Sequence, residues 1–141
     1  MSYRRLDADK ARWRPSNMMG VLNTDLGGQL EASQLAARLW RLEPRQSSTR
    51  HRHRRQEELY LLLEGTGRIR VDGELLTLGP RDAVLVEPES LRQVFNDTDA
   101  DQLWLIVGAP RELASTLEMT DEDLRFLYPD GPKALPPELG D

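Results

Sequence analysis

The stretch ELYLLLEGTGRIRVDGELLTLGPRDAVLVEPESLRQVFNDTDADQLWLIVG, residues 58–108, decides the fold. Short apolar runs alternate in it with turn residues at regular intervals, which is typical of successive β-strands. The expected strands are 58–64, 68–71, 74–78, 82–87, 91–96 and 102–108. Asp72-Gly73 between two of them predicts a tight hairpin in which both turn residues have positive φ. No segment is left for crossover helices, so the strands should be antiparallel and form an all-β sandwich or barrel.

Upstream of this stretch, the run QLAARLWRLE at 34–43 is ambiguous between helix and strand. Its composition suits a helix, but Pro44 ends it after a length that suits a strand, and the strands that follow favour a strand here. Everything before it is polar and rich in turn residues, which predicts an irregular arm that packs on the barrel. The chain therefore divides into an N-terminal arm 1–33, a barrel 34–108 and a C-terminal tail 109–141.

The tail has a helical character that the barrel lacks. Leu113 and Leu117 are one turn apart, which predicts a helix that begins at Pro110. Thr120 and Asp123 have the spacing of a helix cap before a second apolar run. The remaining sequence is rich in proline and should be extended. We therefore expect a short helical tail that ends in a Pro-rich segment.

Length and composition limit the class of protein. A chain of 141 residues can bury one hydrophobic core, which indicates a single domain. The chain has no cysteine, which excludes disulfides, thiol catalysis and every zinc site built on cysteine. Residues 1–15 carry charges throughout, without the apolar core of a signal peptide, and no stretch is long enough to span a membrane. These features predict a soluble cytoplasmic protein with no membrane partner.

The charge is unevenly distributed. The formal net charge is −5, and the excess of acidic residues lies in the C-terminal quarter of the chain. A local basic cluster is formed by Arg50, Arg52, Arg54 and Arg55. Such a cluster could contact phosphate, but in an acidic chain without any nucleic-acid-binding motif a solvated strand end is the favoured interpretation. We therefore expect no nucleic acid as a partner.

The two histidines of the chain, His51 and His53, stand two positions apart. Alternate side chains of a strand share a face, so both imidazoles should point the same way. Two neutral imidazoles that converge on one space can bind a transition metal, and a carboxylate would add a third ligand. Glu57 and Glu58 are the candidates, and strand parity alone leaves both open because a turn must separate them from the histidines.

Residues 45–65 resemble the first sequence motif of the cupin superfamily. That motif is a glycine, five residues, His-x-His, three or four residues, a glutamate, six residues and a glycine. His51, His53, Glu58 and Gly65 match it, and an arginine replaces the first glycine. The resemblance, which covers roughly 34–108, is to small single-domain cupins of type 2. It implies a double-stranded β-helix, also described as a jelly-roll-like antiparallel barrel.

The resemblance also assigns the carboxylate. It makes Glu58 the metal ligand and leaves Glu57 facing away. Tyr60 and Leu62 share the face of Glu58, so they should line the same pocket. Cupins commonly form homodimers through an outer sheet, so a homodimer is expected. Three aromatic residues are then expected in the core or in that dimer interface, namely Trp40, Phe95 and Trp104.

The second cupin motif is degenerate over residues 81–96. Only Asn96 keeps the identity of a motif residue, and Arg92 stands where the resemblance places a fourth ligand, a histidine. Val94 and Asn96 should face the pocket with Arg92, because they follow it at every second position. A guanidinium is permanently charged and cannot coordinate a metal. Either Arg92 orients an anionic substrate beside a three-ligand metal, or it pairs with Glu58 in a metal-free pocket.

The resemblance therefore implies two functions, and the sequence leaves both open. In the first, the protein is a metal-dependent enzyme with isomerase-like or oxygenase-like chemistry, in which His51, His53 and Glu58 bind Fe, Mn, Ni, Co or Zn. In the second, the protein is a metal-free cupin that binds or senses a small molecule and contains an ion pair between Arg92 and Glu58. In both, the ligand is a small molecule, anionic if Arg92 contacts it, that enters the mouth of the barrel.

Overall fold

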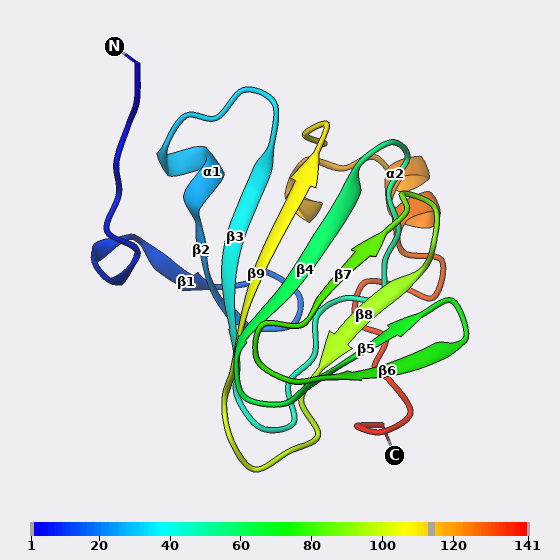
Figure 1. Cartoon of the computed structure of the whole chain (residues 1–141). Coiled ribbons are helices and arrows are strands. Elements are labelled where there is room, and N and C mark those ends of the chain that lie inside the picture. The colour runs from blue at the N-terminus through cyan, green and yellow to red at the C-terminus, as the bar shows by residue number, and fades with distance from the viewer. Residues whose placement is uncertain (1, 113–114, 141) are drawn as a thin grey trace.

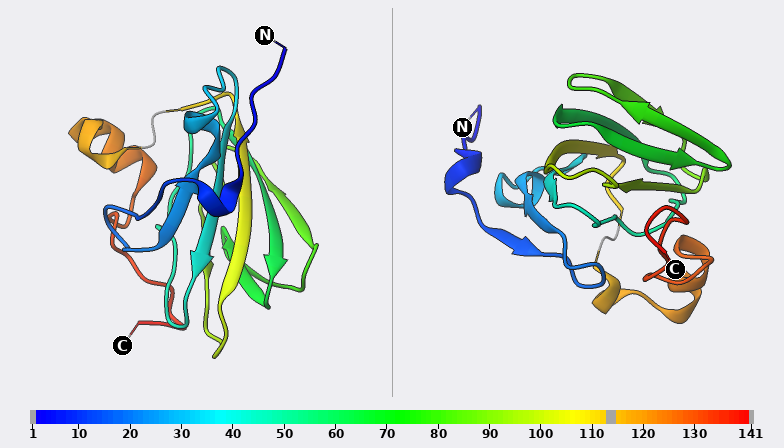
Figure 2. Two further views of the ribbon diagram at one scale, coloured as in Figure 1. Left: turned by 90° about the vertical axis from the view of Figure 1, so that its left-hand side faces the viewer. Right: turned by 90° about the horizontal axis from the view of Figure 1, so that it is seen from below.

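The computed structural model describes residues 2–112 and 115–140, which form two antiparallel β-sheets packed face to face (Figures 1 and 2). The larger sheet contains, in spatial order, β1 (Trp13–Pro15), β2 (Leu22–Asp25), β3 (Ala36–Leu42), β9 (Gln102–Ala109), β4 (Glu57–Glu64) and β7 (Ala83–Val86). The smaller sheet contains β6 (Glu74–Leu78), β5 (Gly67–Val71) and β8 (Arg92–Phe95). The short helices are η1 (Ala8–Lys10), α1 (Leu26–Gln29), η2 (Thr116–Glu118) and α2 (Asp121–Leu127).

The seven strands predicted between residues 34 and 108 are all confirmed, and so is the all-β antiparallel fold class. The ambiguous run at 34–43 is the strand β3 rather than a helix, because it pairs along its whole length with β9. β9 is the last strand in sequence, yet it lies between β3 and β4 and joins them. Along this sheet Arg38 pairs with Ile106, and Ile106 pairs with Tyr60.

The arm at 1–33 is more ordered than its sequence predicts. β1 and β2 extend the large sheet beyond β3, and α1 follows directly on β2 (Figure 1). Both strands have only three or four residues and no apolar alternation, so the sequence contains no strand signal. They form strands because β3 offers its free edge to β2, which is a long-range contact.

The Asp72-Gly73 hairpin is confirmed, since Val71 pairs with Glu74 across it. The expectation of two positive φ values is wrong: Asp72 has φ 52°, and Gly73 is outside the left-handed region. Asp72 is fixed in this conformation by Leu91, whose backbone N–H donates to its carboxylate at 2.9 Å and whose carbonyl accepts from its N–H at 2.8 Å.

The tail is helical in a different place from the one predicted. Residues 110–112 are not helical, so no helix begins at Pro110, and Leu113 lies outside the described residues. The cap at Thr120 and Asp123 is confirmed as a capping box, in which each side chain accepts from the backbone N–H of the other. In the part of the chain that the structure describes, helices are too short or too polar to cross a membrane.

The core lies between the two sheets. Trp104 of β9 and Leu62 of β4 pack against Ile69 of β5 and Val94 of β8. Gly67 allows this packing, because a Cβ at that position would lie 2.4 Å from the Trp104 ring. Of the three aromatic residues expected in the core or a dimer interface, Trp104 and Phe95 are fully buried and Trp40 packs against the core. Trp104 and Phe95 therefore belong to the interior, whereas Trp40 is partly buried and lies beside it.

The predicted homodimer stays a prediction, and the outer face of the large sheet offers a surface for it. Leu85 of β7 is 60% exposed and pairs with Leu59 of β4, which is 41% exposed. Leu59 in turn pairs with Val107 of β9, so apolar side chains continue across three strands. We expect wild-type protein to sediment at twice the mass of the chain, and Leu85→Glu to sediment as a monomer because it places a charge in the interface. Sedimentation equilibrium measures both masses.

Leu75→Glu is the matched control for this prediction. Leu75 lies on β6 of the smaller sheet and is 37% exposed. The Leu75→Glu variant should remain dimeric. A monomeric wild-type protein, or an equal effect of both substitutions, would show that the outer face of the large sheet is not a dimer interface.

Candidate metal centre

His51 and His53 lie on an extended segment beside β8. The backbone N–H and carbonyl of His51 both bond to Arg92, at 3.0 and 2.9 Å, and the N–H of His53 donates to the carbonyl of Pro88 at 2.7 Å. This fixed extended backbone turns both imidazoles to one side, with their ring centroids 5.0 Å apart and their planes perpendicular. The short segment has the alternation of a strand without belonging to a sheet.

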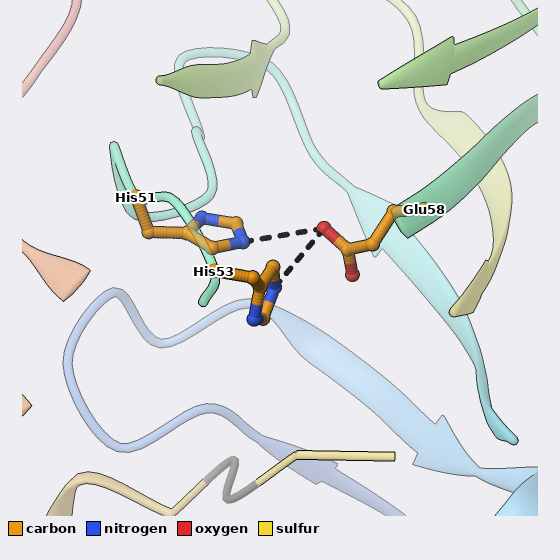
Figure 3. A group of neighbouring side chains, drawn as sticks. All are labelled: His51, His53 and Glu58. Carbon is orange, nitrogen blue, oxygen red and sulfur yellow. Dashed lines mark ion pairs between the residues drawn. The ribbon is translucent and has the colours of Figure 1, made fainter. Parts of the chain in front are cut away.

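Glu58 projects from β4 toward the two imidazoles (Figure 3). Its Oε1 lies 3.4 Å from Nε2 of His51 and 3.3 Å from Nε2 of His53. Glu58 is only 9% exposed, whereas Glu57 is exposed at the surface. The structure therefore brings together the three residues of the predicted centre and places Glu58, not Glu57, inside the barrel.

The outer nitrogen of each imidazole has a partner that orients the ring. Nδ1 of His51 lies 3.0 Å from the carbonyl of Thr49, which can only accept, so this nitrogen carries the proton. Nδ1 of His53 lies 3.3 Å from the carboxylate of Glu112. In a neutral imidazole with a protonated Nδ1, the lone pair of Nε2 is free to bind a metal. A bound cation would lie between these two lone pairs and the Glu58 carboxylate, in the place that a proton on each Nε2 takes when no metal is bound.

The spacing of these atoms fits a metal ion. Two ligand atoms at about 2.1 Å from an ion, in tetrahedral geometry, are about 3.4 Å apart. The two distances from Glu58 to the histidines have this value, and the three ligand atoms all lie within 4.8 Å of one another. Nε2 of His53 is buried and has no hydrogen-bond partner among the described residues. The group His51, His53 and Glu58 could therefore hold a metal, and its N₂O donor set suits divalent transition metals.

The carboxylate of Glu58 is held in its charged form. Burial raises its pKa, but the adjacent imidazoles of His51 and His53, when protonated, outweigh this effect and hold the pKa well below its usual range. Tyr60 donates its hydroxyl to the same Oε1 at 2.7 Å. Burial raises the pKa of Tyr60 well above its usual value, and the negative charge of Glu58 adds to the rise. Tyr60 is thus a permanent donor that helps to fix the carboxylate.

Arg92 lies behind Glu58 rather than on the surface of the cavity. Its side chain is 0% exposed, and its Nη1 is 3.6 Å from Oε1 of Glu58. Its Nη2 donates to the carbonyl of Glu87 at 2.5 Å, while Nε and Nη1 have no hydrogen-bond partner within residues 2–112 and 115–140. The predicted approach of Arg92 to Glu58 is therefore present in the structure, but a substrate in the cavity would not reach this guanidinium.

The centre lies on the wall of a cavity of about 210 Å³. The N-terminal arm and the tail both contribute to its lining, in addition to β3, β4 and β9. Its lining includes Arg14, Asn23, Arg38, Trp40, Tyr60, Ile106 and Tyr128. Tyr60 lies on it as the sequence predicts.

Three residues that the sequence places in the pocket lie elsewhere. Leu62 and Val94 are fully buried in the core between the sheets. Asn96 is also buried, and its amide N–H groups donate to the carbonyls of Leu42 and Ala100. Strand parity correctly turns all three inward, but the interior at their level is filled by the core, so they do not line the cavity.

Glu112 is a residue of the site that sequence reasoning missed. Besides His53, its carboxylate accepts the backbone N–H groups of Arg54, Arg55 and Gln56. Burial raises the pKa of Glu112, but the three backbone hydrogen bonds together outweigh burial. The pKa is therefore lowered below its usual value. Glu112 is 59 residues from His53 and belongs to no motif, so the sequence contains no signal for it.

The sequence suggests that the basic cluster is solvated, but three of its arginines contact the C-terminal tail. Arg50 pairs with Asp130 at 3.1 Å and Arg54 with Asp123 at 3.3 Å, both in the acidic tail. Arg52 donates to the carbonyl of Phe126 at 2.7 Å, with its guanidinium 4.2 Å from the centre of that ring. The tail therefore holds the segment that carries both histidines.

Glu112→Gln should weaken metal binding by about 10- to 100-fold. A neutral amide is a weaker hydrogen-bond acceptor than the carboxylate, so it orients the His53 imidazole less firmly and makes it a weaker metal ligand. Isothermal titration with Zn²⁺ or Mn²⁺ measures this. Glu57→Gln, next to the centre but outside it, is the control and should bind as wild type does. Unchanged affinity in Glu112→Gln would show that Glu112 does not orient a metal ligand.

Comparison with known proteins gives the family. No curated protein matches the chain. Among solved structures, a sugar phosphate isomerase of the cupin superfamily from Silicibacter pomeroyi is 28% identical, with a TM-score of 0.70 over 77% of this chain and 76% of that one. A putative sugar phosphate isomerase from Acidithiobacillus ferrooxidans is 21% identical, with a TM-score of 0.64 over 74% of each chain.

A predicted oxalate decarboxylase from Thermotoga maritima is 20% identical, with a TM-score of 0.66 over 79% of this chain and all of that one. These likenesses agree with the two packed antiparallel sheets of the double-stranded β-helix. The family model described as the cupin domain matches residues 38–108, from β3 to β9. With that match over half of its length, this chain belongs to the cupin superfamily.

Proposed function

We propose that the protein is a metal-dependent enzyme that catalyses an isomerase-type reaction on a small polar molecule in the barrel cavity. The observation that carries the proposal is the convergence of His51, His53 and Glu58 at metal-ligand spacing on the wall of that cavity. Similarity to a sugar phosphate isomerase of the cupin superfamily favours isomerisation over the oxygenase-like alternative.

The bound ion would supply Lewis-acid polarisation of a substrate oxygen. The residues of the chain supply the position of that ion and of the substrate. Thr49 and Glu112 fix the two imidazoles, and Tyr60 fixes the carboxylate of Glu58. Tyr128 lines the cavity with its ring centre 6.3 Å from that of His51. Burial raises the pKa of Tyr128, and the charge of Glu58 adds to the rise, so its hydroxyl remains a hydrogen-bond donor for a substrate.

A second candidate function rests on Arg92. Its buried guanidinium is 3.6 Å from Glu58, an ion pair that would neutralise the carboxylate without a metal. The protein would then be a metal-free cupin that binds a small molecule and has no catalytic activity. The two candidates differ in the metal content of the wild-type protein.

Metal analysis of protein purified without a histidine tag tests the first candidate. We expect about one divalent ion per chain in the wild type and its loss in Glu58→Gln, which removes the charged ligand. Glu57→Gln is the matched control, since it makes the same change one residue away on the exposed face of β4. Isomerisation of a panel of aldose and ketose phosphates, followed by proton NMR in D₂O, should depend on the ion and disappear in Glu58→Gln alone. A metal-free wild type, or activity that survives chelation, would refute the proposal.

Arg92→His separates the two candidates further. If the wild type already binds metal through three ligands, its metal content should stay near one equivalent in this variant. If Arg92 instead neutralises Glu58, the wild type should bind no metal and the variant should gain about one equivalent, because a histidine removes the competing charge and adds a ligand. Titration of both proteins with Mn²⁺, Ni²⁺ and Zn²⁺ measures this, with thermal unfolding as the check on folding.

A further inference from the structure

The cavity has a second polar end. This end lies at β3, whereas the metal centre lies at β4, on the other side of β9. Arg38, Ile106 and Tyr60 form one row over β3, β9 and β4, and all three line the cavity. Neighbouring strands are about 4.8 Å apart, so the backbones of Arg38 and Tyr60 are about 10 Å apart. The floor between these ends is the apolar side chain of Ile106. A ligand long enough to span this distance could contact the metal centre and Arg38 at once.

Arg14 joins Arg38 at this end. Arg14 of β1 pairs with Asn23 of β2, and both line the cavity with Arg38. The same three residues line a second cavity, so space for a ligand remains around both guanidinium groups. The arrangement comes from the N-terminal arm, whose strands the sequence does not predict.

Arg38 is held in place before any ligand binds. Its Nη1 donates to the side-chain oxygen of Asn23 at 2.9 Å, and its Nη2 is 3.4 Å from the carboxylate of Asp25. Asn23 is itself fixed, because its amide donates to the carbonyls of Arg14 and Val21. A guanidinium that is already oriented loses little conformational entropy when it binds an anion.

The positive charge at this end is only half compensated. Asp25 pairs with Arg38, but Arg14 has no ion pair among the residues that the structure describes. Burial lowers the pKa of Arg38; Asp25 opposes this change, and the nearby charges of Arg14 and Arg111 add to it. The charge of Arg14 thus remains uncompensated beside a cavity that Arg12 also lines, where an anion would be attracted.

We propose that Arg14 and Arg38 bind a phosphate group of the substrate at the end of the cavity opposite the metal centre. A phosphate monoester has three terminal oxygens and close to two negative charges, enough to contact two guanidinium groups at once. A carboxylate has two oxygens and one charge, which a single arginine satisfies. The assignment of this phosphate to a substrate rests on the proposed function, whereas the binding of the anion does not. Arg14 and Arg38 thus take the anion-binding role that the sequence suggests for Arg92. Arg92 is fully buried and does not line the cavity.

Isothermal titration of the metal-free protein with inorganic phosphate tests the proposal. We expect saturable binding of one phosphate per chain, weakened at least about tenfold by Arg14→Gln and by Arg38→Gln, since each removes a charged hydrogen-bond donor. Arg38→Lys keeps the charge but loses the planar fork, so it should also bind more weakly. Arg14 lies on an exposed edge strand, so Arg14→Gln decides the matter if the Arg38 variants do not fold.

Arg41→Gln is the matched control. Arg41 lies on the same strand as Arg38 but pairs with Glu64 and Asp101 on the other face, so phosphate affinity should be unchanged. Three outcomes would overturn the proposal: no saturable binding of phosphate, equal affinity in the wild type and Arg14→Gln, or an equal loss in Arg41→Gln. Acetate that binds as tightly as phosphate would overturn the assignment to phosphate.

Metal titration of the same variants separates this proposal from the proposed function. Arg14→Gln and Arg38→Gln should bind Zn²⁺ or Mn²⁺ as the wild type does, and His51→Ala should bind phosphate without binding metal. Phosphate binding without metal binding in the wild type would refute the proposed function and leave the phosphate subsite standing. Metal binding without phosphate binding in the wild type would refute the phosphate subsite and leave the proposed function standing.

Discussion

Glu58 is a charged residue at a nearly buried position, and the polar side chains around it compensate its charge. A buried carboxylate without partners costs several kcal/mol, so it must be surrounded by donors or cations. Its Oε1 is shared by Tyr60, Arg92 and the two histidines. Those partners need partners of their own, which the rest of the chain provides.

The partners of the histidines show how far this requirement extends. Glu112 follows the last strand, yet it anchors both the ring of His53 and the backbone of the residues after it. The tail then fastens the neighbouring arginines through Asp123 and Asp130. The opposite charges that the sequence shows at 50–55 and in the C-terminal quarter are thus two sides of one contact. Their pairing holds the ligands of the metal centre at fixed positions.

Local sequence was sufficient for the elements that depend on local rules. Strand alternation and turn residues predict the strands from 34 to 108, and alternation predicts the shared face of His51 and His53, whereas the choice of Glu58 comes from the resemblance to the cupin motif. Alternation gives the face of a side chain but not its depth, so Leu62 and Val94 were placed in the pocket when they lie in the core. For the same reason, alternation leaves two roles open for Arg92, contact with a substrate or pairing with Glu58, and its side chain lies behind Glu58.

Residues brought to the site by long-range contacts had no local signal. β1 and β2 are too short to show a period, so the cavity wall that contains Arg14 and Asn23 was not foreseen. Arg38 was part of a predicted strand, but its position opposite Tyr60 depends on the register of β9 between two other strands. Register is set by the packing of the whole sheet, which one sequence does not display.

The central place of β9 also determines when this protein can fold on the ribosome. β3 and β4, which carry Arg38 and Glu58, are not paired with each other, and β9 is the strand that bridges them. During synthesis they wait without a common neighbour until residue 109 has emerged, although the hairpin of β5 and β6 can close much earlier. Contacts between distant parts of a chain form slowly, so a high contact order is built into this sheet. The cavity is therefore assembled by the last strand to be made, and until then the apolar faces of the nascent strands remain open to chaperones and to aggregation.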